Sequence, residues 1–277
     1  MEISDYQLKK LRNYLNNEIG IYVDDSKMQT IYKRKLLKLL KEKGYSDFEE
    51  FYKDLVLKKS SFLKQDLINV FMVNETYFFR EKYQFDTLVK HVLPELHIKR
   101  PANEIINILC APVSSGEELY SIAIMLMEEG ELIKKRDFML LGIDVDSDAI
   151  AKAKAGIYSA RSVHKLPPEL IEKYFVKTGN LYKVKDFLKK AVNFKIVNIM
   201  DKYQMKKLGM FDVIFSRNML IYFDEKSKRE VLATFYNILK NDGYLFLGHA
   251  ERVPSDIVLF KSMKIGDSFV YKKTADS

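Results

Sequence analysis

The chain has 277 residues, a formal net charge of +8 and one cysteine, and 47% of its residues are hydrophobic. This length allows one large domain or two small ones with a sizeable core. One cysteine excludes an internal disulfide, and with four scattered histidines it excludes a structural zinc site, so no metal is expected. We find no apolar run long enough to span a bilayer and no signal peptide, and we therefore expect a cytoplasmic protein. The positive charge favours nucleic acid, an anionic membrane or an acidic protein as partner, without choosing among them.

Residues 1–73 are predicted to form a small all-helical domain with one strongly basic helix. Apolar residues recur at helical spacing over 27–43, and Gly44 suits the position just after a helix end. A solvated face is the ordinary explanation for charges on a helix, but seven basic residues against one acid favour a docking surface. A shorter helix is predicted at 47–57. The basic residues of the first helix are Lys27, Lys33, Arg34, Lys35, Lys38, Lys41 and Lys43.

A connector at 74–81, with the sequence NETYFFRE, leads into a larger domain that extends over 74–277. Phe78 and Phe79 stand beside Arg80 and Glu81, which is unusual for a solvent loop. The simplest alternative to a functional role is that the two rings wedge domains together. A helix is predicted to follow at about 83–96.

The stretch 105–126 has the order strand, small-residue loop, helix, which is typical of the opening unit of a nucleotide-binding α/β sheet. Backbone N–H groups of such a loop, together with the helix N-terminus, can approach a ligand. Ala111, Ser114 and Ser115 stand where glycines are usual, and we expect them to fit only if φ stays negative. An ordinary βα turn remains an equal alternative for this stretch alone. Cys110 is expected to be a small buried residue.

An acid follows the second predicted strand, 139–143. In this position Asp144 can accept hydrogen bonds from both hydroxyls of an adenosine ribose. The alternative is that Asp144 caps the next helix, 147–155, but Asp146 or Ser147 is better placed for that role.

The remaining pattern predicts three more parallel strands, a closing hairpin and an insertion. The 53 residues between Asp144 and Asn198 are too many for a single crossover, so we expect an inserted small β-containing subdomain at about 156–191. A helix capped by Asp224 is expected to continue through Leu239 and to end at Gly243. Strands that alternate with helices predict an α/β fold with a parallel sheet covered on both faces. The further strands are expected at 192–197, 211–215 and 244–247, and the hairpin at 260–272.

Several motifs then resemble one family. They are N-x-T-x-F-F-R-E at 74–81, A-P-x-S-S-G-E-E at 111–118, G-I-D-V-D at 142–146, A-x-x-G-I-Y at 153–158, F-D-V-I-F-S-R-N-x-x-I-Y-F at 211–223 and G-H-A-E at 248–251. In this order they are similar to the CheR family, bacterial chemotaxis methyltransferases that esterify glutamates on receptor cytoplasmic helices. The resemblance covers nearly the whole chain. It implies a Rossmann-like class I methyltransferase sheet with S-adenosylmethionine as cofactor and S-adenosylhomocysteine as product.

The resemblance also implies roles for individual residues. Arg80 and Tyr222 would act on the substrate, Arg80 by aligning a carboxylate and Tyr222 by offering its ring to the sulfonium or its hydroxyl to the carboxylate. A glutamate is already ionised near neutral pH, so no general base is required. The basic helix would dock receptor methylation helices through Lys33, Arg34, Lys38 and Lys41. The cofactor would be held by Asn74, Thr76, Arg80, Glu118, Asp144, Asn198, Ile199, Arg217 and Asn218.

Two other functions stay open from the residues. A nucleic-acid methyltransferase would use the positive charge, but the place after the fourth strand lacks the prolines expected of base-methylating enzymes. A non-catalytic sensor of the cofactor is the other alternative, and the presence of Arg80 and Tyr222 argues against it. Some members of the resembled family bind a C-terminal tether of the receptor through an extra glycine-containing loop in the inserted subdomain. Segment 175–184 of this chain is short and has one glycine, so it departs from that pattern. The residue types suggest no role for His249, and we expect a monomer.

Overall fold

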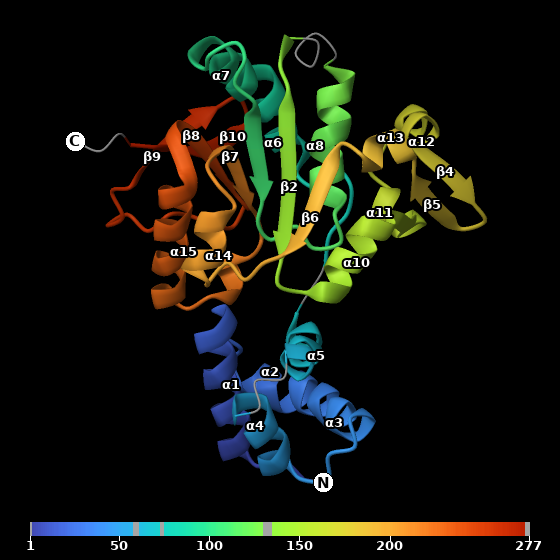
Figure 1. The fold of residues 1–277 in the computed structure, drawn as a ribbon, viewed down its shortest axis with the longest axis vertical. Helices are drawn as coiled ribbons and strands as arrows, with labels where there is room; N and C mark the ends of the chain where they lie inside the picture. Colours follow the sequence, from blue (N-terminus) through green and yellow to red (C-terminus); the bar gives the residue numbers. More distant parts are fainter. Residues whose placement is uncertain (1, 58–60, 73–74, 130–134, 275–277) are drawn as a thin grey trace.

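We describe the protein from a computed structural model that places residues 2–57, 61–72, 75–129 and 135–274. Figure 1 shows three parts: a group of N-terminal helices, a central sheet with helices on both faces, and a small subdomain at one side. The N-terminal group consists of α1 (Asp5–Ile19), α2 (Asp25–Lys27), η1 (Met28–Tyr32), α3 (Lys33–Glu42), α4 (Phe48–Leu57) and α5 (Ser61–Phe71).

The basic segment predicted as one helix over 27–43 is helical but not uniform. A π-helical turn, η1, joins α2 to α3, and Gly44 follows the helix with φ +79°. The apolar side is buried, with Tyr32 stacked on Phe71 of α5 at a centroid separation of 4.6 Å. The buried positions of this helix are the apolar residues that recur at helical spacing, Met28, Tyr32, Leu36, Leu39 and Leu40.

The large sheet has the strand order β6-β2-β1-β7-β8-β10-β9. The first five strands are parallel, and β10 is antiparallel to both of its neighbours. This arrangement confirms the Rossmann-like α/β class predicted from the sequence. The strands are β1 (Ile106–Cys110), β2 (Phe138–Asp144), β6 (Val192–Ile196), β7 (Phe211–Ser216), β8 (Leu239–Leu247), β9 (Phe260–Ile265) and β10 (Ser268–Lys273).

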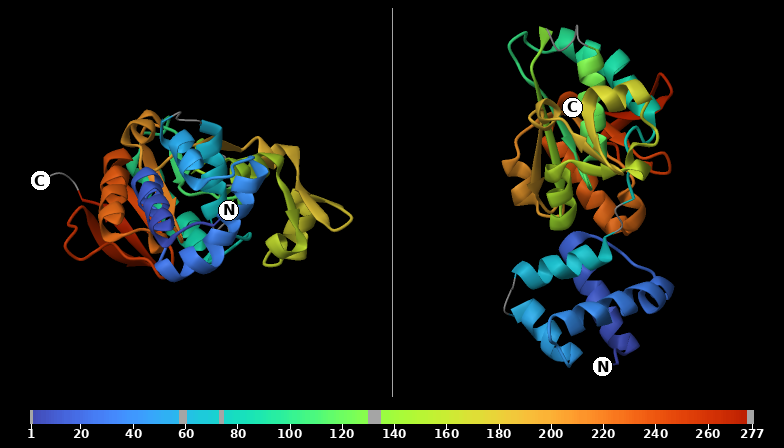
Figure 2. Two further views of the ribbon diagram at one scale, coloured as in Figure 1. Left: turned by 90° about the horizontal axis from the view of Figure 1, so that it is seen from below. Right: turned by 90° about the vertical axis from the view of Figure 1, so that its right-hand side faces the viewer.

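Helices cover both faces of this sheet, as Figure 2 shows from the side. Strands buried on both faces are expected to be apolar throughout, and β7 is buried at every position. Two hydrophobic cores result, and Phe215 of β7 stacks on Phe246 of β8 at 4.4 Å within one of them. One face carries α14 (Lys202–Lys207) and α15 (Glu225–Ile238), and the other carries α6 (Lys82–Thr87), η2 (Leu88–Val92), α7 (Leu93–Lys99) and α8 (Glu117–Glu128).

The segment after α10 (Ser147–Ala155) forms the small subdomain, whose three strands pair antiparallel in the order β3-β5-β4. Phe78 meets it edge-on, with ring centroids 4.9 Å from Tyr158 and 5.1 Å from Phe175. The Phe78 ring therefore packs between the large sheet domain and this subdomain. The remaining elements are β3 (Ile157–Ser159), α11 (Ala160–Val163), α12 (Pro168–Tyr174), β4 (Phe175–Thr178), β5 (Leu181–Val184) and α13 (Asp186–Lys189).

The predicted helix end at Gly243 is wrong. Helix α15 ends at Ile238, and Leu239 is already the first residue of β8. The register of β7 with β8 jumps from Phe211–Leu239 to Val213–Tyr244, so the intervening residues bulge out of the ladder. A Cβ on Gly243 would lie 2.9 Å from the carbonyl oxygen of Asp212. Glycine is therefore required at this bulge by close backbone approach, and it does not act as a helix cap.

The N-terminal helices sit on the edge of the sheet where the parallel strands end (Figures 1 and 2). The side chain of Asn198 donates to the carbonyl oxygen of Glu18 at 2.6 Å, and Gln65 donates to that of Val145 at 2.7 Å. A β-bridge joins Ile21 to Phe223. The N-terminal helices thereby cover the strand ends, where ligands bind in sheets of this kind. We call this helical cover, made by residues before 73, the roof.

Candidate active site

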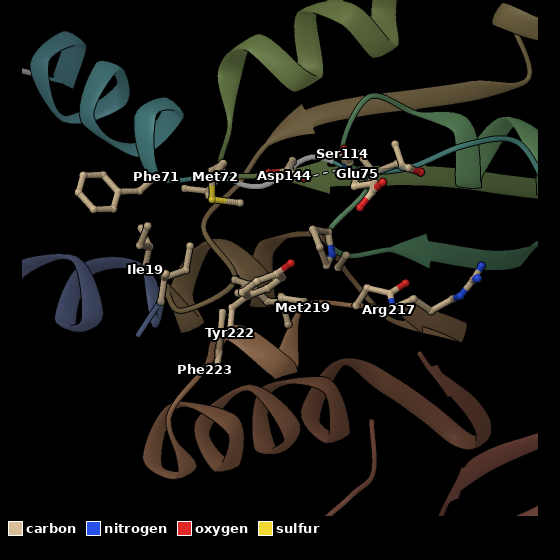
Figure 3. A pocket seen from close by; sticks show the side chains of 18 of the residues that line it. Ile19, Phe71, Met72, Glu75, Ser114, Asp144, Arg217, Met219, Tyr222 and Phe223 are labelled. Atoms are coloured by element: carbon tan, nitrogen blue, oxygen red, sulfur yellow. Dashed lines mark hydrogen bonds between the residues drawn. The ribbon is translucent and has the colours of Figure 1, made fainter. Parts of the chain in front are cut away.

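A cavity of about 400 Å³ lies under this roof, at the carboxyl ends of β1, β2, β6 and β7. Figure 3 shows that helices α1 and α5 and the loops after the strands contribute side chains to it. The structure brings nine of the residues predicted from the sequence to its walls, from positions far apart in the chain. These are Thr76, Arg80, Glu118, Asp144, Asn198, Ile199, Arg217, Asn218 and Tyr222.

The other predicted residues are placed differently. Asn74 lies outside the described residues. The docking residues of the basic helix do not line the cavity: Lys33 is half-buried, and the side chains of Arg34, Lys38 and Lys41 face solvent. His249 is exposed in a turn, where its carbonyl oxygen accepts a hydrogen bond from Arg252.

The carboxylate of Asp144 is buried at the end of β2 and is held by two backbone donors. Oδ2 accepts from the N–H of Ser114 at 2.8 Å, and Oδ1 accepts from the N–H of Asp146 at 2.9 Å. Burial raises the pKa of Asp144 to about 6, against the effect of these hydrogen bonds. The cap of α10 is Asp146, whose side chain accepts from the backbone of Asp148 and Ala149, so Asp144 is not needed as a cap.

The same interaction explains why one expectation for the small-residue loop is wrong. Ser114 has φ +51°, in the left-handed region that favours glycine and in which a serine was not expected to fit. Its N–H points at the Asp144 carboxylate, as the dashed line in Figure 3 marks. A charge-assisted hydrogen bond can offset the cost of about 1–2 kcal/mol for such a backbone conformation. Gly116, with φ +96°, precedes α8.

Arg217 is the centre of a buried ion-pair cluster in the wall of the cavity. Its Nη1 lies 2.9 Å from Glu118 and its Nη2 lies 3.4 Å from Glu81. Nη2 also donates to the carbonyl oxygen of Arg80 at 2.6 Å, and the guanidinium lies over the Phe85 ring at 5.2 Å. Arg217 therefore fixes Glu118 and the backbone of Arg80, in addition to lining the cavity.

Glu118 lines the cavity and has one carboxylate oxygen without a hydrogen-bond partner in the described part of the chain. Its Oε1 is buried and has no hydrogen-bond partner among the described residues, while Oε2 pairs with Arg217. Burial raises the pKa of this carboxyl, and the charge of Arg217 opposes the shift. A buried acceptor without a donor is costly, so a ligand that brings a donor, such as an ammonium group, would be favoured here.

Arg80 and Tyr222 line the cavity from different segments. The Nη1 of Arg80 donates to the carbonyl oxygen of Glu75 at 2.6 Å, and the guanidinium lies 5.9 Å from the Tyr77 ring centroid. Tyr222 ends the short helix η3 (Leu220–Tyr222), and 36% of the residue remains exposed. Figure 3 shows the ring pointing into the cavity, across from Asp144.

The family follows from comparison with known proteins. The model named CheR methyltransferase, SAM binding domain, matches residues 74–269 of this chain. The chain belongs to the CheR methyltransferase family. Chemotaxis protein methyltransferase 2 of Vibrio cholerae is 37% identical over 272 residues, which cover 98% of this chain and 94% of the relative. The chemotaxis protein methyltransferase of Salmonella typhimurium is 32% identical, with 100% of this chain and 93% of the relative covered.

The residues of this CheR-family cavity fit S-adenosylmethionine, as the name of the matching domain implies. The unpartnered Glu118 oxygen suits an α-ammonium group, and the buried Asp144 carboxylate suits a pair of hydroxyl donors. Among the described residues, no group of three or more His, Cys, Asp or Glu side chains is placed to hold a metal ion. Likewise, no helix in the described ranges is both long and apolar enough to cross a bilayer.

Residues of the N-terminal helices that line this cavity were not among those predicted from the sequence. Lys27, Ile31 and Lys35 line it from the basic helix, together with Tyr22 and Met72. The spacing i, i+4, i+8 of the first three was visible in the sequence and places them on one face. Nothing in the sequence indicated that this face turns toward the sheet, since that depends on how the two domains pack.

Proposed function

We propose that this chain transfers a methyl group from S-adenosylmethionine to glutamate side chains on chemoreceptor cytoplasmic helices, forming methyl esters. One observation carries the choice of acceptor. Lys35 and Arg80 both line the cavity, and both donate to backbone carbonyl oxygens, of Val70 and Glu75 respectively. The Glu75 carboxylate pairs instead with Arg161 at 3.0 Å. The positive charges of Lys35 and Arg80 therefore favour an anionic acceptor beside Tyr222.

The relatives support the same proposal. They are named chemotaxis protein methyltransferases, and the match to this chain covers nearly their full length. A carboxylate acceptor needs no general base near neutral pH, since it is already ionised. The chain then has to supply alignment and exclusion of water. We assign alignment to Arg80 and the lining beside the transferred group to Tyr222.

In the proposed arrangement, the cofactor supplies a methyl group on a positively charged sulfur. Asp144 would hold the ribose hydroxyls and Glu118 the ammonium group. Asn198 and Ile199 would flank the adenine. The remaining cofactor surface would be lined by Thr76, Arg80, Arg217 and Asn218. We propose the same role for Asn74, which is not among the described residues. The Tyr222 ring can face the positive charge of the sulfur, as in a cation–π contact.

The receptor would dock on the N-terminal domain, which we propose to be 1–73, and react in the domain 74–277, from which the subdomain at about 156–191 projects. The solvent-exposed side of α3, which we call its crest, carries Arg34, Lys38 and Lys41, and the half-buried Lys33 lies beside it. A helix that carries glutamates could lie along this crest while one carboxylate reaches the cavity. We propose that the chain does this as a monomer.

The test is methyl transfer in solution. The protein is incubated with radiolabelled S-adenosylmethionine and a purified receptor cytoplasmic fragment, and methanol released by mild alkali is counted. We expect alkali-labile label on the fragment, and its loss when the acceptor glutamates are changed to glutamine. Label in RNA or DNA instead would support a nucleic-acid methyltransferase. Cofactor binding without any transfer would support a sensor.

A further inference from the structure

Glu251 is a buried carboxylate that the proposed chemistry does not use. Only 3% of the residue is exposed. Its Oε2 accepts from the backbone N–H of Gly248 at 2.7 Å and from that of Asn218 at 2.8 Å, and its Oε1 accepts from the N–H of Ile221 at 3.4 Å. One carboxylate thus joins the ends of the neighbouring strands β7 and β8 through three backbone donors.

Two of these donors belong to the loop that carries Tyr222. Asn218 has φ +57°, and this left-handed backbone is disfavoured for a residue with a side chain. Ile221 lies in η3, one residue before Tyr222. The loop returns to the core through Leu220, which is buried, whereas the Tyr222 ring itself is partly exposed in the cavity. The hydrogen bonds to Glu251 therefore hold the backbone on both sides of Leu220.

The absence of a side chain at Gly248 leaves room for the Glu251 carboxylate. A Cβ at this position would lie 2.7 Å from Glu251 Oε2 and 2.8 Å from the backbone nitrogen of Asn218. Any side chain here would push the carboxylate away from the loop. Gly248 and Glu251, which follow the end of β8, thus form the binding site for the backbone of the loop after β7.

We propose that Glu251 is a positioning residue that sets the place of Tyr222 in the cavity by fixing the backbone of 218–221. This proposal rests on the proposed function only because receptor methylation is its assay. The hydrogen bonds of Glu251 themselves do not involve a substrate. A glutamine at 251 would turn an N–H₂ group toward at least one of the three donors. The loop would then lose at least one hydrogen bond at almost constant side-chain volume.

The experiment is a double-mutant cycle between Glu251 and Tyr222, with receptor-fragment methylation as the readout. We expect Glu251→Gln to lower kcat at least tenfold, with KM for the fragment changed less than threefold. In a Tyr222→Ala background the same change should alter kcat less than twofold, because the residue it positions is gone. An equal loss of kcat in both backgrounds would overturn the proposal.

A matched control is Glu95→Gln. Glu95 also receives three donors, from Tyr244 at 2.6 Å, Lys99 at 2.8 Å and Lys272 at 2.9 Å, but it lies in α7 at the opposite end of the sheet (Figure 1). We expect it to lower Tm while kcat of the folded protein stays within twofold. If Glu251→Gln does not fold, Gly248→Ala displaces the same carboxylate and enters the cycle in its place.

A second readout does not depend on methyl transfer. The chain has no tryptophan, and Ile221 is 51% exposed, so Ile221→Trp places a single reporter on the loop. We expect Glu251→Gln to lower the fluorescence anisotropy of this reporter, and Glu95→Gln to leave it unchanged. Unchanged anisotropy with Glu251→Gln would overturn the positioning role. Lowered anisotropy in a protein that does not methylate receptor would overturn the proposed function alone.

Discussion

The backbone N–H of Tyr22 donates to the carbonyl oxygen of Tyr222 at 2.8 Å. This hydrogen bond belongs to a short antiparallel bridge between Ile21 and Phe223, so the segment after α1 pairs with the segment after η3. The N-terminal domain therefore holds the Tyr222 loop from the roof of the cavity. We expect a disturbance of this bridge to affect both the roof and the site beneath it.

The first prediction concerns Gly20, which lies directly before the bridge. Its φ is +76°, and a Cβ would lie 2.8 Å from Phe223 Cε2 and 3.0 Å from Met200 Sδ. Gly44 has φ +79° with nothing within 4 Å, so Gly44→Ala measures the backbone cost alone, about 1–2 kcal/mol. Gly20→Ala should cost about 1–3 kcal/mol more in urea denaturation, because it also overpacks the roof. Equal losses would mean that the bridge tolerates the added methyl group.

A second prediction follows from the pKa of Asp144, which burial raises to about 6. If the ionised carboxylate holds the ribose, protonation below this pKa removes the binding-competent form. The Kd for S-adenosylhomocysteine should then rise about tenfold between pH 7 and pH 5, as measured by calorimetry. Asp144→Asn should bind more weakly at pH 7 and show little of this dependence. The assignment is wrong if the wild-type Kd is constant over this range.

A third prediction concerns the buried cluster around Arg217. Arg217→Ala leaves Glu118 and Glu81 without their cation, and breaking a buried pair in this way costs about 3–5 kcal/mol. Adding Glu118→Gln should recover part of that loss, because one unpaired carboxylate is removed. Urea denaturation of the two single variants and the double variant measures the coupling. A double variant as unstable as the sum of the singles would contradict the buried pairing.

The fourth prediction concerns receptor docking. Lys38→Glu with Lys41→Glu should raise KM for the receptor fragment several-fold, since each exposed charge contributes about 0–1 kcal/mol. Cofactor affinity should not change, because neither residue lines the cavity. Higher salt should reproduce part of the loss in the wild type. Lys261→Glu with Lys264→Glu makes the same charge change on β9 and should leave KM unaltered. Similar effects of the two pairs would mean that net charge, and not the crest of α3, governs docking.

Local signals made most of the helices and strands predictable from the sequence. The helix at 147–155, the strand at 211–215 and the cap at Asp224 lie where the pattern predicts them. The predictions for Gly243 and Ser114 were wrong for one reason. Gly243 is required by the carbonyl of Asp212, and the backbone of Ser114 is held by Asp144, 30 residues away. Secondary-structure propensity describes the backbone preference of a single residue. It does not include contacts with residues that are distant in the sequence.

The sequence by itself determined the fold class, the family and the residue types of the site, because periodicity and ordered motifs are properties of the chain. Only the tertiary structure decided what surrounds those residues. It turned Lys27 and Lys35 toward the cavity, gave Arg217 its carboxylate partners and brought Glu251 under the Tyr222 loop. These relationships depend on how separate elements pack, and packing is set by long-range contacts that no local pattern encodes.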